Sequence, residues 1–123
     1  MAARARQADW LRGFGRVTIT ASQRARFDEI KTGRCVACWQ RGITTIGCDA
    51  HHLLSGGRRR GHEYSVALCA HHHRGIPFDG VTGPQMRSLY GPSLMDGSKR
   101  FREAYGTDDE LLALQERMIR GEV

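Results

Sequence analysis

Histidines and cysteines gather between residues 35 and 73 of this 123-residue chain, at spacings that suit metal binding. All six histidines lie within residues 51–73. The doublet His51-His52 opens this segment, and the cysteine-led run Cys69-Ala-His-His-His73 closes it. Imidazole and thiolate groups bind zinc and other divalent ions, and a free imidazole can take a proton near neutral pH. The segment therefore predicts a divalent metal beside a general base.

Two pairs of candidate ligands are each separated by two residues. Cys35-x-x-Cys38 lies at an expected turn, and Cys69-x-x-His72 lies at the expected start of a helix. Together they predict a Cys3His set for a structural Zn²⁺, which would staple distant parts of a small core. The alternative is a group of unrelated buried cysteines. Cys48 has no partner at this spacing and is expected to be a buried thiol.

The remaining histidines predict a second, catalytic centre. His51 and His52 are neighbours near the end of an expected strand, so their side chains point to opposite faces. His73 follows the zinc ligand His72 by one helical position, a rotation of about 100° that turns it toward the strands. We expect His51 and His73 to bind the catalytic metal and His52 to act as general base. Mg²⁺ or Mn²⁺ would suit this site, and Zn²⁺ could also occupy it.

Several assignments in this segment stay open. His51 and His52 could instead be hydrogen-bonded strand residues without a catalytic role. His71 is an alternative to either of the two histidines that follow it, because the sequence does not fix the phase of the helix. Asp49 shares a strand face with His51 and could be an additional ligand or could orient that histidine. His62 could support the site, contact the substrate or simply be exposed.

Basic residues predict a polyanionic partner. The formal net charge is +6 and the isoelectric point is about 9.7, values typical of proteins that bind nucleic acid. The run Arg58-Arg59-Arg60 follows a Gly-Gly pair between the two histidine clusters, so we expect these side chains to contact phosphates. The alternative is a solvated basic surface. Phosphate contacts alone do not distinguish DNA from RNA.

The chain has no apolar run of 18 or more residues, which excludes a membrane-spanning helix from the expectations. Its arginine-containing N-terminus is not followed by the apolar stretch of a secretory signal. We therefore expect a cytoplasmic protein, in which cysteines serve as thiols or metal ligands rather than disulfides.

Local signals predict an α+β fold. Residues 1–21 form a basic N-terminal arm, either a nucleic-acid-binding segment or a frayed terminus, and residues 22–123 form one domain. Ser22 is the expected N-cap of a helix that ends at Gly33. A strand pair over residues 43–54, a strand over 64–68 and a helix over 69–75 complete a zinc-stapled ββα-metal core.

Flanking helices are expected in the C-terminal third. Pro84 suits a first helical turn, Ser98 is an expected N-cap, and Thr107 begins a capping box before an amphipathic helix that ends at Gly121. The apolar face of the last helix is expected to pack on the core, and the oligomeric state is left open.

The histidine doublet and the Cys69–His73 run resemble the HNH nuclease motif. In that motif a strand provides a metal ligand and the general base, and a helix that opens with Cys-x-x-Cys-His provides a second metal ligand. This chain departs from it in two places. His72 stands where the second cysteine is usual, and Tyr64 or Ser65 stands where the central asparagine, which orders the loop or binds metal, is expected.

The segments HHLLSGGRRRGHEYSVALCAHHHRGIP, YGPSL and FREAYGTDDELL resemble the phage Ref family of RecA-dependent HNH nucleases. The resemblance covers roughly residues 22–115. It implies a metal-dependent DNA endonuclease that cuts where a host RecA filament has paired strands, such as a displacement loop, in the cytoplasm of a phage-infected bacterium. RecA dependence rests on the resemblance alone. The alternatives are an HNH nuclease that acts without RecA and a catalytically silent zinc module that binds DNA.

Overall fold

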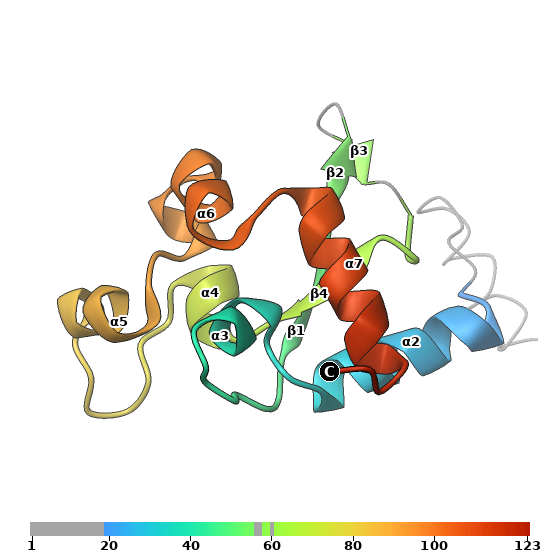
Figure 1. Cartoon of the computed structure of the whole chain (residues 1–123), viewed down its shortest axis with the longest axis horizontal. Helices are drawn as coiled ribbons and strands as arrows, with labels where there is room; N and C mark the ends of the chain where they lie inside the picture. Colours follow the sequence, from blue (N-terminus) through green and yellow to red (C-terminus); the bar gives the residue numbers. More distant parts are fainter. Residues whose placement is uncertain (1–18, 56–57, 60) are drawn as a thin grey trace, which may run out of the picture.

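The computed structural model describes residues 19–55, 58–59 and 61–123, and their fold is α+β, as predicted (Figure 1). In chain order the elements are α2 (Ala21–Thr32), α3 (Val36–Gln40), β1 (Asp49–His52), β2 (Leu54–Ser55), β3 (Arg58–Arg59), β4 (Ser65–Leu68), α4 (Ala70–Arg74), α5 (Gly83–Tyr90), the 3-10 turn η1 (Leu94–Asp96), α6 (Ser98–Tyr105) and α7 (Asp108–Ile119).

A ββα unit lies at the centre of the fold. Strands β1 and β4 pair antiparallel, with Asp49 opposite Leu68 and His52 opposite Ser65, and α4 follows β4 after one residue. Every residue of β4 is buried, whereas β1 is half-buried. Helix α4 ends at Gly75, whose left-handed φ of 71° favours glycine. The order strand, strand, helix therefore matches the sequence-based expectation.

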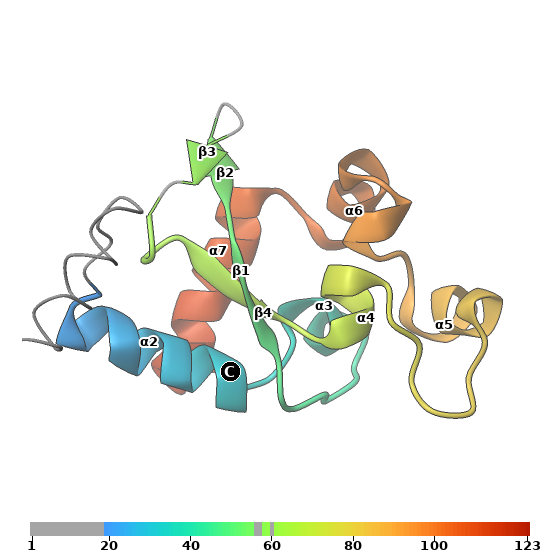
Figure 2. The same ribbon diagram turned by 180° about the vertical axis from the view of Figure 1, so that it is seen from behind.

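Two helices enclose the strand pair. Helix α2 packs against β1 and α7 packs against β4 (Figures 1 and 2). Ile30 of α2 and Leu111 of α7 are almost fully buried. The buried Gln115 side chain of α7 accepts a hydrogen bond of 2.7 Å from the backbone N–H of Ala67 in β4. That contact satisfies a strand-edge group that would otherwise be buried without a partner.

Arg26 ties three elements together. From α2, its guanidinium donates to the Ser65 carbonyl of β4 at 2.6 Å and to the Ser65 hydroxyl at 3.3 Å. It also forms an ion pair with Glu116 of α7. The guanidinium is largely buried, so this contact fixes both helices on the end of β4 that lies opposite His52.

Helix α2 begins earlier than predicted. Thr20, not Ser22, is its N-cap, and Thr20 and Gln23 form a reciprocal capping box. The box satisfies two backbone N–H groups at once, which explains why Thr20 prevails over Ser22. Residues 1–18 of the expected arm lie outside the described residues.

The strand expected over residues 43–46 is wrong. This segment makes one isolated bridge, between Ile46 and Arg34, and otherwise wraps around α3. The Thr45 carbonyl accepts from Cys35 N–H at 2.9 Å, and Ile43 N–H donates to the Cys38 carbonyl at 3.0 Å. The backbone groups of residues 43–46 thus form hydrogen bonds with the turn that carries Cys35 and Cys38, and the strand begins only with β1. Leu54 belongs to a separate short hairpin, β2–β3, which projects from the body (Figure 1).

The C-terminal helices follow the predictions closely. Helix α5 has Pro84 in its first turn, and Thr107 forms the predicted capping box with Glu110. Helix α6 differs in one detail, because its N-cap is Gly97 and Ser98 is already helical. No helix among the described residues is long and apolar enough to cross a membrane.

Candidate metal and catalytic centre

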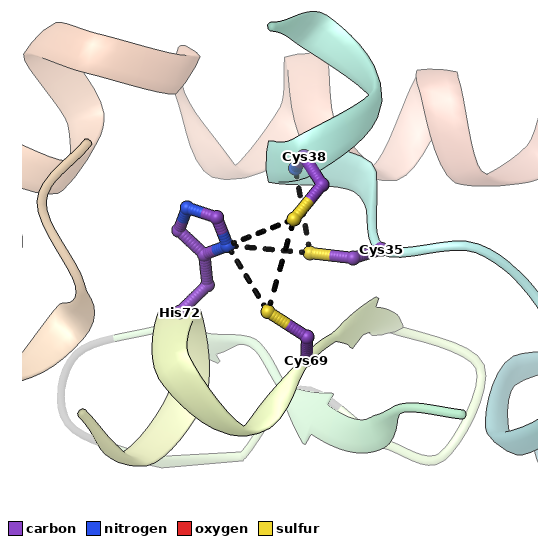
Figure 3. A group of neighbouring side chains, drawn as sticks. All are labelled: Cys35, Cys38, Cys69 and His72. Atoms are coloured by element: carbon purple, nitrogen blue, oxygen red, sulfur yellow. Dashed lines mark hydrogen bonds between the residues drawn. The ribbon is translucent and has the colours of Figure 1, made fainter. Parts of the chain in front are cut away.

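Cys35, Cys38, Cys69 and His72 converge at one buried point (Figure 3). The three Sγ atoms lie 3.5, 3.4 and 3.2 Å from His72 Nδ1, and the Sγ atoms of Cys38 and Cys69 lie 3.8 Å apart. Zinc bond lengths of about 2.3 Å to sulfur and 2.0 Å to nitrogen give tetrahedral edges of about 3.8 Å between sulfurs and 3.5 Å between sulfur and nitrogen. The cluster therefore has the dimensions to hold zinc.

The local folds place these four atoms. Cys35 is the N-cap of α3 and Cys69 is the N-cap of α4, so each pair brackets the first turn of a short helix. Hydrogen bonds with Cys35 and Cys38 hold the pKa of the Cys69 thiol well below its usual range. A thiolate is the form that binds metal. Among the described residues, this is the only group of three or more metal-ligand side chains close enough to share an ion.

Contacts around the cluster select the ligand atoms. His72 Nε2 lies 2.8 Å from the Tyr90 carbonyl and 2.9 Å from the Tyr105 hydroxyl. A hydrogen on Nε2 leaves the lone pair on Nδ1, which faces the sulfurs. The Thr45 hydroxyl donates to Cys38 Sγ at 3.2 Å. Cys48 lies outside the cluster and is buried, as predicted.

His71 is not at either candidate centre. It is almost fully buried, and its Nε2 lies 2.9 Å from the Gly91 carbonyl. The contact joins α4 to the turn that follows α5. The helix phase that the sequence left open is thus resolved: His72 faces the cysteines, and His71 has a packing role.

His51 and His73 lie side by side, at the predicted meeting point of β1 and α4. Their ring centroids are 5.2 Å apart. His73 Nδ1 lies 2.9 Å from Asp49 Oδ2, and Arg74 Nε donates to the same oxygen at 2.8 Å. Asp49 therefore orients His73, not His51 as one open alternative had it. With the hydrogen on Nδ1, the Nε2 atom of His73 keeps its lone pair for a metal.

The surroundings of His51 favour the uncharged imidazole. Burial lowers its pKa to about 4, and nearby His73 contributes in the same direction. The ring is thus neutral at neutral pH, which is the form that binds a metal. Two adjacent imidazoles can hold a divalent ion that keeps open positions for water and phosphate.

His52 points to the opposite face of β1, toward α2. Its Nε2 lies 3.2 Å from Nδ1 of His62. Phe27 of α2 packs edge-on against both rings, with centroid distances of 5.7 and 5.3 Å. His52, His62, Phe27 and Lys31 line part of an open hollow of about 460 Å³. His62 thus contacts His52 and is not a simply exposed side chain, a contact that no local sequence pattern indicates.

Ser65 occupies the neighbourhood where the asparagine of the HNH motif is expected. Its buried hydroxyl donates to the His62 carbonyl at 2.9 Å. No local sequence signal indicates a role for Ser65 or for Arg26, which hydrogen-bonds to it. Of the arginine run, Arg58 and Arg59 form β3, opposite Ser55 and Leu54, and Arg60 lies outside the described residues.

A family model described as "Recombination enhancement, RecA-dependent nuclease" matches residues 19–120. The match includes both histidine centres and most of the chain. The chain belongs to this RecA-dependent nuclease family. No curated protein matches the sequence.

Membership in the RecA-dependent nuclease family gives the clustered histidines a chemical context. A nuclease must activate a nucleophile and stabilise charge on a phosphate. The match begins at residue 19, one position before the Thr20 cap of α2, so it includes Phe27, which packs on His52, and Arg26, which holds Ser65.

Proposed function

We propose that this chain is a metal-dependent endonuclease of the HNH type that hydrolyses phosphodiester bonds of DNA. Its substrate would be DNA that a RecA filament has paired, such as a displacement loop. One observation supports this most directly. The β1–β4–α4 unit holds His51 beside His73 on one face, while His52 lies on the other face against an open hollow.

In this proposal the three histidines divide two tasks. His51 and His73 hold a divalent metal, Mg²⁺ or Mn²⁺, and Asp49 fixes the ring of His73. His52 removes a proton from the attacking water. When bound, the metal supplies Lewis-acid stabilisation of charge that develops on the phosphate and the leaving oxygen.

The other residues position the reactants. The positive side chains of Arg58, Arg59 and Arg60 contact the DNA backbone near the scissile phosphate. The buried Cys35, Cys38, Cys69 and His72 hold a structural Zn²⁺ that fixes the start of α4 relative to α3. The position of His73 in space then depends on the zinc cluster, because His73 follows a zinc ligand directly.

The test is a nicking assay on a displacement loop, with Mg²⁺ or Mn²⁺, in the presence and absence of RecA filaments. We expect cutting only when the metal and RecA are both present. His52→Ala should lose at least about a hundredfold in rate, since general-base catalysis supplies a factor of this size. Lys99→Ala on α6, which changes an exposed side chain, is the control and should cut normally.

Three results would contradict parts of the proposal. Equal cutting with and without RecA would make the protein a RecA-independent HNH nuclease. DNA binding without cutting under either metal would indicate a silent zinc module. Cutting of RNA in place of DNA would overturn the assigned substrate.

A further inference from the structure

We propose that His62 is a positioning residue that fixes the orientation and the tautomer of His52. The inference rests on the proposed function, in which His52 is the general base. It concerns a side chain in the turn before β4, ten residues along the chain from His52 and outside the strand–helix elements that carry the other histidines.

The rings of His52 and His62 contact each other through one nitrogen of each ring. His52 Nε2 and His62 Nδ1 lie 3.2 Å apart, which is hydrogen-bonding distance. A neutral imidazole carries its hydrogen on only one of its two nitrogens. In the proposed arrangement His52 Nε2 donates and His62 Nδ1 accepts. With that hydrogen on Nε2, the basic nitrogen of His52 would be Nδ1.

Packing against neighbouring rings restricts the rotation of both His52 and His62. Phe27 meets the ring of His52 at an interplanar angle of 60° and that of His62 at 83°. The two histidines meet each other at 68°, with centroids 5.4 Å apart. Each ring thus packs edge-on against two others. Such packing favours one orientation of each ring, as a positioned base requires.

The turn that carries His62 is anchored to β4, the strand that pairs with β1. The Ser65 hydroxyl donates to the His62 carbonyl at 2.9 Å, and Ser65 lies directly opposite His52 in the register. Arg26 in turn holds Ser65 through its carbonyl and its hydroxyl. Within the turn, Tyr64 N–H donates to the Gly61 carbonyl at 3.1 Å.

This chain of contacts gives Ser65 a task. The asparagine that the HNH motif would place in this neighbourhood orders the loop or binds metal. Here the serine hydroxyl orders the turn, and the ring of His62 extends from that turn to the base. The proposal therefore links Arg26, Ser65 and His62 into one support for His52.

The experiment compares three substitutions of His62 in the full-length, zinc-loaded protein. His62→Ala removes the ring, His62→Phe keeps a ring without nitrogen, and His62→Asn keeps an acceptor near the position of Nδ1. Nicking of a RecA-paired displacement loop should fall about tenfold to a hundredfold in the first two, because a misplaced catalytic group costs a factor of this order. His62→Asn should stay within about threefold of wild type.

A second readout observes the tautomer directly. Ring ¹⁵N spectra of the protein without added Mg²⁺ or Mn²⁺ should show His52 with its hydrogen on Nε2 in the wild type and in His62→Asn. His62→Ala and His62→Phe should show a mixture of both tautomers. A residue with a merely structural role would not change this ratio. Glu63→Ala, which removes a 2.5 Å contact of the same turn with Gln23, is the control and should match wild type in both readouts.

The outcomes separate this inference from the proposed function. If His52→Ala is inactive but all His62 variants cut normally, the positioning role is wrong. If all three His62 variants lose activity equally, with the His52 tautomer unchanged, His62 contacts the substrate instead. If His52→Ala itself cuts normally, the assignment of the base fails. Zinc content and circular dichroism identify a variant that fails to fold. If His62→Ala or His62→Phe fails to fold, the His52 tautomer in His62→Asn is compared with that in wild type, and a difference would contradict the positioning role.

Discussion

His73 and His52 each contact a neighbouring polar side chain, and the two neighbours differ in chemistry. His73 contacts the carboxylate of Asp49, whereas His52 contacts the imidazole ring of His62. A carboxylate raises the basicity of the ring that donates to it and so strengthens a metal ligand. An imidazole nitrogen that accepts the hydrogen bond, as proposed for His62, fixes the partner ring through one directional contact. The two partners thus suit the different tasks proposed for these histidines.

Removing the Asp49 carboxylate should weaken the metal site. In Asp49→Ala the ring of His73 loses the acceptor for its Nδ1 hydrogen, so Nε2 no longer faces the metal in all molecules. We expect Mn²⁺ affinity to fall about ten- to hundredfold, the usual effect of losing such a partner. Calorimetric titration of Mn²⁺ measures it. Arg74→Ala, which removes only the other contact of the same oxygen, should change affinity much less.

His51 should make stability depend on pH. Its folded-state pKa is lowered from 6.5 to about 4 by burial, so between these values the unfolded chain binds a proton that the folded chain does not. The free energy of unfolding is therefore not lowered by this group above pH 6.5, and it decreases as the pH drops toward 4. The loss is at most about 3 kcal/mol, at 1.36 kcal/mol per unit of pKa.

Urea unfolding at pH 7 and pH 4.5, without added Mg²⁺ or Mn²⁺, checks this expectation. The difference in unfolding free energy between wild type and His51→Asn should shrink or reverse at the lower pH. Since both proteins share the thiolates and Asp49, their difference isolates His51. An equal difference at both values would contradict the assigned environment of the ring.

At the scale of elements, α3 and α4 are too short to be stable alone. Each has five residues, and isolated helices of this length do not form in water. Their N-caps, Cys35 and Cys69, belong to the same buried cluster. Zinc bound there would join the first turns of α3 and α4, and this would fix the position of the His73 ring on α4.

Loss of one ligand should therefore unfold the centre of the fold. In Cys69→Ser we expect less than one zinc per chain and a melting temperature lower by roughly 10 °C or more, because metal binding and folding are coupled. Cys48→Ser is the matched control: this buried cysteine lies outside the cluster, so zinc content should be unchanged. Metal analysis and thermal unfolding by circular dichroism measure both.

The sequence predicts those parts of the site that depend on local spacing. Cys35-x-x-Cys38 and Cys69-x-x-His72 each cover one helical turn, and the one-residue step to His73 turns its side chain from the cysteines to β1. Capping signals at Pro84 and Thr107 also placed helices correctly. In each case the signal that supports the prediction is a spacing or a cap between residues a few positions apart.

Contacts between distant residues could not be predicted in this way. Residues 43–46 have strand-forming side chains, yet their backbone hydrogen bonds go to the cysteine turn. Arg26 and Ser65 are 39 residues apart, and their contact depends on how α2 crosses β4. Asp49 contacts His73 rather than His51 because α4 brings the ring of His73 next to the Asp49 carboxylate.

At the scale of the whole molecule, charge is the property that bears on DNA. The net charge of +6 attracts a polyanion from any direction, but only side chains next to phosphates displace bound counterions. The β2–β3 hairpin, which projects from the body in both views, carries Arg58 and Arg59 (Figure 2). A contact role for this hairpin can therefore be separated from the general effect of charge.

Two charge-matched triple variants make that separation. Arg58→Gln, Arg59→Gln and Arg60→Gln together lower the net charge from +6 to +3, that is 6 − 3. The same change results from Lys99→Gln, Arg100→Gln and Arg102→Gln on the exposed side of α6. If the hairpin arginines contact three phosphates, the slope of log affinity against log salt should become shallower by about 2.7, at about 0.9 per contact.

The α6 variant should keep the wild-type slope and lose only a little affinity, because its charges act at long range and are screened within about 10 Å at 0.1 M salt. Fluorescence anisotropy with a duplex at several salt concentrations measures both variants. Equal slopes for the two variants would mean that the arginine run only adds to the overall charge. A shallower slope for the hairpin variant alone would identify that hairpin as the part of the molecule that meets the DNA backbone.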